Sequence, residues 1–372
     1  MLPKSPPTGF ARLTPTAARA VLLGLAGVCA FLVALSLSPQ AIVNPGKPTD
    51  PNAGDPALYR AEAERIHNGE PYYDVLAEEL PARGYPTRSV FNWRTPLPVW
   101  LIGKLPDVDW GKSLLGLLGL TLLVASFEAV ARDGSVRRAI GAACLLTGPL
   151  LLAMQDHHYG MPVLWSGTLI GLSVAAYGLK RPGWGVGLGL AAVFFRELAL
   201  PYAVLMAAIA LWHRRRPELT AWAVGLGAWF VFFGWHCVQV LPRIAPDAIA
   251  HEHGWITLAG ARFVLAVVQM NAYLIVLPQW VAALYFVAAM LGLAGWHTPL
   301  GQRAGLVVCL FVAAFAVVGQ PFNQYWGGLI APLLCFGVAR APASLAELWR
   351  RAGPFGLRIP GLARSAAKAP PA

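Results

Sequence analysis

Hydrophobic residues fall along this chain in long runs, and short polar segments separate most of them. An α-helix rises about 1.5 Å per residue, so about 20 apolar residues cross a bilayer core, and several runs here are shorter than that. The pattern predicts an all-α, polytopic transmembrane protein with about ten spans. The candidate spans are 19–38, 110–131, 137–154, 162–179, 184–195, 198–212, 219–241, 279–296, 304–319 and 326–340.

One polar stretch, residues 40–94, is far longer than the others and follows the first candidate span. We expect it to form most of a large first external loop, residues 39–109, whose amphipathic helices lie on the membrane interface. A helix over 57–68 is predicted there, because its charged and apolar residues are mixed and Asn68-Gly69 is a typical helix end. Catalytic residues concentrate in loops that a rigid scaffold positions, so this loop is the first candidate for a site.

Composition supports a membrane location. Of 372 residues, 57% are apolar and 13% are charged, whereas soluble domains carry about 25% charged residues. The first apolar run is long enough to be a retained helix rather than a cleaved signal peptide. The five cysteines all lie in apolar runs and show neither the spacing of a disulfide framework nor that of a metal site; they are Cys29, Cys144, Cys237, Cys309 and Cys335.

The net charge is +11, and the positions of the basic residues indicate the membrane topology. Lys and Arg cluster in short segments between apolar runs and in the C-terminal tail, at 132–138, 180–181, 214–216 and 340–368. By the positive-inside rule these segments, and both termini, are expected on the cytoplasmic side. No basic face with interleaved aromatic residues is present, so no nucleic-acid partner is expected. We expect one transmembrane domain over 1–340 and a disordered cytoplasmic tail over 341–372.

The run 184–212 has two interpretations, because Arg196 and Glu197 interrupt it. As a hairpin of two short helices it keeps both flanking basic clusters cytoplasmic, which the positive-inside rule favours. Residues 241–278 are then external, and 261–277 lies along the membrane surface. As one helix, 184–212 would instead require 261–277 to cross the membrane.

Asp55 also has two interpretations. Asp-Pro before Ala-Leu-Tyr-Arg-Ala-Glu resembles a helix start, with Asp55 as the N-cap and Pro56 at the first helical position. Alternatively, the Asp55 carboxylate is a general base, which must lie near the hydroxyl that it deprotonates. Asp156, in a predicted external loop, is either a second site carboxylate or part of a polar turn.

Two arginines at membrane boundaries are candidates for phosphate contacts. Arg94 either extends its side chain toward lipid headgroups or binds a phosphate, for which the guanidinium geometry is suited. The pair Arg196-Glu197 lies within an apolar run, and an ionisable pair there is a candidate for function, the alternative being a structural ion pair.

Polar and aromatic residues elsewhere complete the candidate site. An amide and aromatic segment near the C-terminus suits hydrogen bonding to and stacking on a sugar, with an aromatic belt as the alternative. The His-Glu-His sequence at 251–253 is too short for a zinc-protease motif, and His157-His158 has no further ligands at zinc spacing, so the sequence supports no metal cofactor. The candidate substrate-binding residues are Tyr59, Glu197, His251, Asn323, Gln324 and Tyr325. Gly167 and Gly171 form a close-packing signal between helices.

In the order of these elements the chain resembles the GT-C superfamily of integral membrane glycosyltransferases, and in particular its mannosyltransferase-like members. The segments that carry the resemblance are DPALYRAEAERIHNGEPYY (55–73), FNWRTPLPVW (91–100), GLGLAAVFFRELALPYAVLMA (187–207) and GQPFNQYWGGLIAPLL (319–334). Members typically take a sugar from a polyprenyl-phosphate carrier at the external membrane face, with an acidic residue of the first external loop as base and inversion at the anomeric carbon.

Carried onto this chain, the resemblance implies that Asp55 is the base, that Asp156 corresponds to a second-loop acid, and that Arg196 or Arg94 holds the carrier phosphate. Asp55 is followed by Pro56 instead of the second acid that some branches have, which leaves a divalent metal requirement and the branch open. The resemblance also implies a location in the bacterial inner (plasma) membrane.

The expected function is therefore transfer of a sugar from a polyprenyl-phosphate carrier in membrane lipid to a glycan, lipid or protein acceptor. One alternative is a flippase or transporter of lipid-linked sugars. Such a protein should show interrupted helices in two matching halves, and the sequence shows one interrupted pair. A non-catalytic membrane scaffold is the other alternative, and it predicts no functional dependence on the candidate residues.

Overall fold

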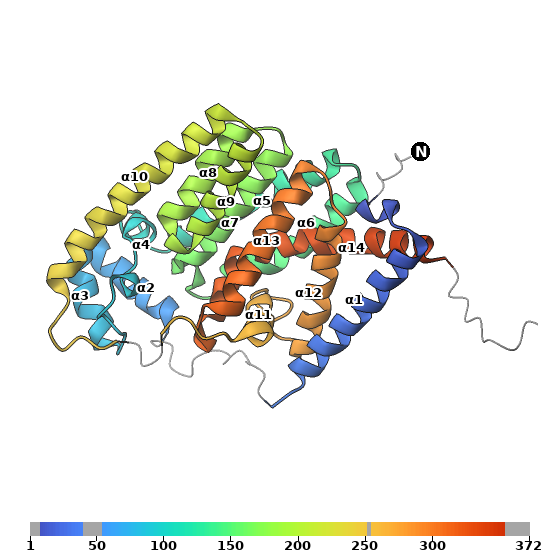
Figure 1. The fold of residues 1–372 in the computed structure, drawn as a ribbon. Coiled ribbons are helices and arrows are strands. Elements are labelled where there is room, and N and C mark those ends of the chain that lie inside the picture. The colour runs from blue at the N-terminus through green and yellow to red at the C-terminus, as the bar shows by residue number, and fades with distance from the viewer. Residues whose placement is uncertain (1–7, 40–53, 251–253, 354–372) are drawn as a thin grey trace, which may run out of the picture.

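The computed structural model describes residues 8–39, 54–250 and 254–353, and these residues are almost entirely helical (Figure 1). The helices of the first half are α1 (Pro15–Ser36), α2 (Asp55–His67), α3 (Tyr72–Ala82), α4 (Leu97–Gly103), α5 (Trp110–Arg132), α6 (Val136–Ala153) and α7 (Pro162–Gly178). Those of the second half are α8 (Pro182–Phe195), α9 (Leu200–Trp212), α10 (Arg216–Val240), α11 (Gly260–Val268), α12 (Gln279–Ala294), α13 (Pro299–Val317) and α14 (Ala331–Ala352). Short 3₁₀ helices include η3 (His158–Gly160), η4 (Glu197–Ala199) and η6 (Pro321–Leu329).

Five helices in the described part of the chain, α1, α5, α6, α10 and α13, are long and apolar enough to cross a membrane. A sixth span results if η6 and α14, which meet at a bend of 69°, are counted together. The apolar helices α7, α8, α9 and α12 are shorter. Each of the ten predicted runs coincides with one of these segments, so the prediction of an all-α polytopic membrane protein is confirmed.

The helix starts follow from local sequence. Thr14, Ser135 and Thr298 precede α1, α6 and α13, and their side-chain oxygens accept hydrogen bonds from backbone N–H groups of the first turn. Proline stands in the first turn of several helices, where no N–H donor is lost. These signals are short-range, which is why the sequence locates the helices well.

Helix α7 forms the centre of the molecule. Every residue from Pro162 to Tyr177 is buried, and the helix packs against α5, α8, α13 and η6. A helix that is apolar on all sides is typical of the interior of a helical bundle. Because α7 is packed on all sides, it holds the neighbouring segments α8 and η6 in fixed positions.

Helices α8 and α9 form a hairpin. The break falls at Arg196, whose backbone is extended (φ −154°, ψ 119°). A Cβ atom on Gly189 in α8 would lie 2.8 Å from the ring of Tyr202 in α9. These residues stand at similar distances on either side of the break, so the two helices fold back along each other, and the single-helix interpretation is excluded.

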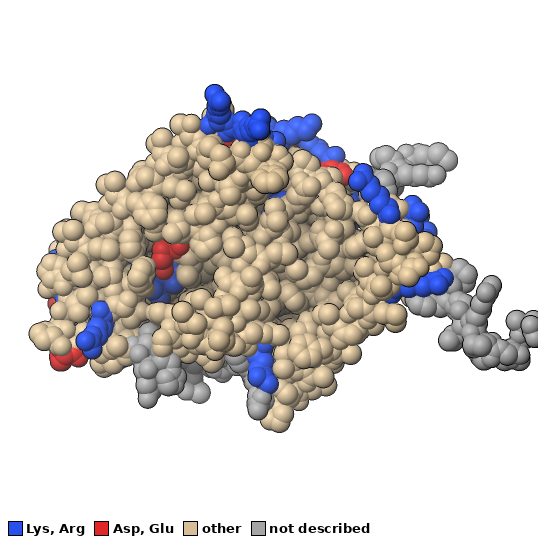
Figure 2. All heavy atoms as spheres, in the orientation of Figure 1, with Lys and Arg blue, Asp and Glu red and all other residues tan. Residues whose placement is uncertain are grey.

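Helix α10 runs parallel to α8. Leu190 meets Gly225, and the rings of Phe194 and Phe232 lie 5.3 Å apart, so the numbers rise together along both helices. The basic segments that precede α8 and α10 therefore lie at the same end of the bundle. Figure 2 shows basic side chains gathered at the top, over the ends of these helices.

The loop helices α2, α3 and α4 lie at the other end of the bundle, beside the C-terminal end of α10 (Figure 1). The Tyr73 hydroxyl is 3.0 Å from His236 Nδ1, and Arg243 forms an ion pair of 2.8 Å with Asp74. These contacts fix α3 against α10.

Residues 261–277 do not form a span. Helix α11 has nine residues, about 14 Å at the usual helical rise, which is too short to cross a bilayer core. It packs against η6, α12 and α13. This agrees with the hairpin interpretation, in which the segment does not cross.

The predicted boundary at residue 340 is wrong. Helix α14 continues to Ala352, and Leu348 and Ala352 are buried against Ala18 of α1. Residues 341–352 are therefore an ordered part of the packed helices, because their apolar side chains follow the helical period on the buried face. The rest of the predicted disordered tail, 354–372, lies outside the described residues.

Candidate functional site

Asp55 is the first residue of α2, in the segment between α1 and α5. Gly54, with a φ of +86°, precedes it as the N-cap residue, and no side chain caps this helix end. Instead, Asp55 Oδ1 accepts a hydrogen bond of 2.7 Å from the Tyr85 hydroxyl. The N-cap interpretation of Asp55 is therefore wrong by one position, and its carboxylate is turned toward Tyr85.

One face of α2 carries Asp55, Tyr59, Glu62 and Ile66, because positions three and four apart share a face of a helix. Tyr59, Glu62 and Ile66 are buried. Burial raises the pKa of the Tyr59 phenol well above its usual range, so its hydroxyl stays protonated at neutral pH. This face points into the site.

Arg94 approaches that face from the segment before α4. Its Nε donates to the Tyr59 hydroxyl at 3.2 Å, and its Nη1 donates to the Phe91 carbonyl at 2.9 Å. The Tyr72 hydroxyl donates to the Arg94 carbonyl at 2.8 Å, which fixes the backbone. The guanidinium is thus held beside the tyrosine.

Arg196 and Glu197 stand at the break between α8 and α9 and form an ion pair of 3.1 Å. Their side chains are 3% and 14% exposed. Within the described part of the chain, Arg196 Nε and Glu197 Oε2 are buried without hydrogen-bond partners, and Arg196 Nη1, the atom that lies 3.1 Å from Glu197 Oε1, forms no hydrogen bond either. Unpaired polar atoms at such depth are costly, so this break is suited to receive a polar ligand.

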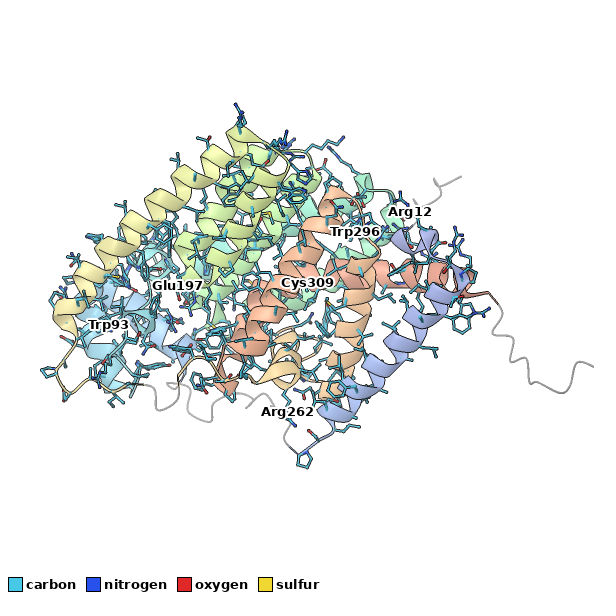
Figure 3. The ribbon with its side chains drawn as sticks, viewed as in Figure 1. Arg12, Trp93, Glu197, Arg262, Trp296 and Cys309 are labelled. Carbon is cyan, nitrogen blue, oxygen red and sulfur yellow. The ribbon has the colours of Figure 1, made fainter. Side chains whose placement is uncertain are left out.

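The position of the pair is visible on the surface. Figure 3 labels Glu197 between the loop helices and the bundle. At the same place Figure 2 shows a carboxylate patch with basic atoms below it in a hollow of an otherwise uncharged surface. The site is therefore reachable from outside the helical bundle.

The 3₁₀ helix η6 contributes Tyr325. Asn323 and Gln324 on the same segment are buried and serve the local backbone. Asn323 Oδ1 accepts from the Gln320 N–H at 2.9 Å, and the Gln324 amide nitrogen faces the carbonyls of Pro321 and Phe322. Tyr325 therefore lies at the site, whereas the Asn323 and Gln324 amides stabilise the backbone of η6.

These side chains form one electrostatic cluster. The charges of Arg94, Asp55 and Arg196 all act on the Tyr59 hydroxyl, and Asp55, Arg94 and Arg196 also act on Tyr325. Glu197 lies within electrostatic range of Arg94. We call this group the Asp55 cluster; its members are Asp55, Tyr59, Arg94, Arg196, Glu197 and Tyr325. Four separate parts of the sequence meet there.

Asp156 lies apart from the Asp55 cluster. It is exposed, with a φ of +39°, and its loop contacts Arg60 through His157 and Tyr159, at 3.1 and 3.2 Å. Arg60 projects from α2 about 140° around the helix axis from Asp55. The structure therefore does not pair Asp156 with Asp55, and we do not retain Asp156 as a second site carboxylate. His251 lies outside the described residues.

Two neighbours of the Asp55 cluster were absent from the sequence-based candidates. Glu62 is 1% exposed, and burial, opposed by the charge of Arg94, raises the pKa of its carboxyl to about 8. Its spacing of seven residues from Asp55 was a usable signal, because it places both on one helix face. Tyr85 had no such signal, since a loop residue's partner depends on how the loop folds.

Among the described residues, no group of three or more His, Cys, Asp and Glu side chains could hold a metal ion. The positively charged groups of the cluster are the two guanidinium groups, which match an anionic ligand, and the tyrosine hydroxyls add hydrogen-bond donors. The arrangement therefore suits a phosphate next to a carboxylate.

No protein-family model matches the chain, and no curated protein matches its sequence. Among solved structures, the crystal structure of ArnT from Cupriavidus metallidurans in the apo state matches with 15% sequence identity and a TM-score of 0.47. The match covers 88% of this chain and 60% of ArnT, so the chain spans about three fifths of the length of that protein. A likeness at this level does not carry activity, substrates or partners from one protein to the other.

Proposed function

We propose that the protein is a membrane glycosyltransferase that moves a sugar from a polyprenyl-phosphate carrier to an acceptor hydroxyl, with inversion at the anomeric carbon. The acceptor belongs to a glycan, a lipid or a protein. The observation that carries this proposal is the buried, incompletely bonded Arg196, whose charge acts on the Tyr59 hydroxyl together with those of Arg94 and Asp55. The resemblance of the sequence to GT-C glycosyltransferases supports it.

The two arginines are suited to the carrier phosphate. A guanidinium presents parallel N–H donors that match two phosphate oxygens, and its charge is permanent. Arg196 pairs with Glu197 through Nη1, yet neither Nη1 nor Nε forms a hydrogen bond among the described residues. A phosphate that enters would satisfy these donors, while Arg94 and the Tyr59 hydroxyl, which are bonded to each other, would contact its other oxygens.

Asp55 is suited to the proton transfer. In the proposed step the acceptor oxygen attacks the anomeric carbon, and its proton passes to the Asp55 carboxylate. The bond from the anomeric carbon to the phosphate oxygen breaks, and its electron pair stays on the phosphate, which leaves with the carrier lipid. The arginines stabilise the charge that develops on that oxygen. Asp55 therefore activates the acceptor, and the arginines stabilise the leaving group.

The placement of the cluster fits a lipid-linked donor. The loop segments that carry Asp55 and Arg94 lie at the bundle end opposite the basic loops. The positive-inside rule assigns these basic loops, and both termini, to the cytoplasm. A carrier lipid in the outer half of the bilayer could then present its phosphate at the break between α8 and α9. We propose a location in the bacterial inner membrane on this basis and on the resemblance.

The test is a transfer assay with the purified full chain in lipid, offered a panel of polyprenyl-phosphate sugars and several acceptors. We expect the wild-type protein to release free polyprenyl phosphate with one donor, and Asp55→Asn to lower turnover by about 10²- to 10⁴-fold. Asp107→Asn is the matched control, because Asp107 is an exposed loop carboxylate away from the cluster.

Two outcomes would contradict the proposal. Full turnover by Asp55→Asn would remove Asp55 as the base. Absence of release by wild-type protein that binds the carriers would contradict an enzyme, and translocation of a carrier in vesicles would then indicate a transporter.

A further inference from the structure

The hydrogen bond between Tyr85 and Asp55 leaves the two carboxylate oxygens in different environments. Oδ1 accepts from the Tyr85 hydroxyl at 2.7 Å. Within the described residues, Oδ2 has no such bond. A carboxylate held by one oxygen presents the other in a defined direction, which is what a general base requires.

Tyr85 is held in place independently of Asp55. The C-terminus of α3 closes with hydrogen bonds from the Gly84 N–H to the Pro81 carbonyl and from the Tyr85 N–H to the Leu80 carbonyl, each of 2.9 Å. Gly84 has a φ of +73°, a conformation that glycine adopts at such helix ends without strain. The helix end therefore fixes the start of the Tyr85 side chain, and the half-buried phenol reaches the start of α2.

The environment of Tyr85 keeps it a donor. Burial, followed by the charge of Asp55, raises the pKa of the Tyr85 phenol above its usual range. The hydroxyl therefore remains protonated at any pH at which the protein works. A hydrogen bond donated to the charged form of a carboxylate favours that form.

We propose that Tyr85 is a positioning residue for Asp55, whose Oδ1 it holds so that Oδ2 faces the acceptor hydroxyl and takes its proton. This inference rests on the proposed function only in the role that it gives to Oδ2. The other titratable or charged groups that face Asp55 come from α2, the segment before α4, and η6; they are Tyr59, Glu62, Arg94 and Tyr325.

The first experiment needs no substrate. A carbodiimide with an amine nucleophile modifies a carboxyl group in its protonated form, and mass spectrometry of the peptide that contains Asp55 follows the reaction across pH. At a given pH, Asp55 should be modified up to about tenfold faster in Tyr85→Phe than in the wild type, because Oδ1 loses the hydroxyl that binds it. Tyr273→Phe is the matched control, since the Tyr273 hydroxyl contacts Thr147, remote from Asp55, and should leave the profile unchanged.

The second experiment measures transfer with the donor that the panel identifies. We expect Tyr85→Phe to lower kcat about tenfold with KM within about twofold, and to move the acidic limb of the pH profile of kcat/KM upward. In the Asp55→Asn background, Tyr85→Phe should have no further effect on turnover, because the residue acts through Asp55.

The outcomes separate the two proposals. A shifted modification profile without transfer from any donor would support the Tyr85 inference and contradict the enzyme. Normal transfer by Tyr85→Phe with an unshifted profile would overturn the inference and leave the enzyme intact. If Tyr85→Phe does not fold, 3-fluorotyrosine introduced at position 85, a stronger donor of the same shape, should move the modification profile to lower pH, and no movement would overturn the inference.

Discussion

Single buried charges define what the Asp55 cluster can bind. Arg196 is 3% exposed, and its charged partner among the described residues is Glu197. Removing one member of a buried ion pair leaves the other uncompensated and is strongly destabilising, so the pair must be changed together to isolate its role in binding.

We predict that Arg196→Ala combined with Glu197→Gln binds free polyprenyl phosphate at least about tenfold more weakly than the wild type. Hydrogen bonds to charged groups are worth about 1.5–3 kcal/mol, which corresponds to a factor of about ten or more. The measurement is a titration of the purified protein by tryptophan fluorescence. Arg215→Ala is the control, because Arg215 is half-exposed at the other end of the bundle, and equal affinity in both variants would remove Arg196 from the phosphate site.

A second prediction at the residue scale concerns the protonation of Glu62. Its carboxyl is buried, and its pKa of about 8 in the folded protein lies above the value of about 4.3 in an unfolded chain. Between these values the folded state binds a proton that the unfolded state does not. Its contribution to stability is therefore fully present below about pH 4 and is lost as the pH rises toward 8.

Glu62→Gln should remove this contribution. We expect the wild type to lose up to about 1.4 kcal/mol per pH unit from this group between pH 5 and 8, so the melting temperature of the variant should fall less steeply over that range. Thermal unfolding of both proteins in the same detergent at several pH values measures the difference. Parallel curves would show that Glu62 titrates at its usual pH in the folded protein.

At the scale of elements, close approach between α7 and η6 places Tyr325. A Cβ on Gly167 of α7 would lie 1.9 Å from the Gly328 carbonyl oxygen on η6. The close-packing signal in the sequence indicated that Gly167 contacts another segment. The structure identifies that segment as η6, whose Tyr325 belongs to the Asp55 cluster.

We predict that Gly167→Ala lowers both stability and transfer. The added methyl group must push η6 away, and overpacking of this kind costs about 1–3 kcal/mol. Gly227→Ala in α10 is the matched control, since a Cβ there meets nothing within 4 Å, and it should be neutral or slightly stabilising. Melting temperature and turnover are the two readouts, and an unchanged melting temperature of Gly167→Ala would contradict the tight contact.

At the scale of the whole molecule, the hairpin sets which loops share a side of the membrane. Because α8 and α10 are parallel, the segments before them lie at one end of the bundle, and the loop helices lie at the other. The fold therefore predicts relative sidedness without reference to any membrane in the structure.

Single cysteines in a background without the five native ones would test this arrangement. We expect Lys180→Cys and Arg214→Cys to react with a membrane-impermeant maleimide from the same side, and Asp107→Cys to react from the opposite side. Labelling of intact cells against opened cells gives the result. Labelling of positions 180 and 214 from opposite sides would contradict the hairpin.

The sequence by itself determined the helices, the hairpin preference and several members of the Asp55 cluster. Hydropathy, caps and basic clusters are properties of neighbouring residues, so they can be recognised without knowledge of the fold. Arg94 and Arg196 stood out because charged side chains are costly next to or within apolar runs, and Asp55 stood out as a carboxylate in the long polar loop. The sequence also placed the end of the packed chain at residue 340, because prolines and arginines there resemble a tail, although α14 continues to Ala352.

Only the tertiary structure decided which of the candidates meet. In the sequence Asp55 and Asp156 are both loop carboxylates, yet the loop of Asp156 contacts Arg60 of α2 through His157 and Tyr159, and Asp156 does not join the Asp55 cluster. Tyr85 binds Asp55 across thirty positions of sequence, and η6 brings Tyr325 from far along the chain. Such contacts depend on helix packing and loop closure, which link residues distant in sequence, so no local pattern of polar and apolar positions specifies them.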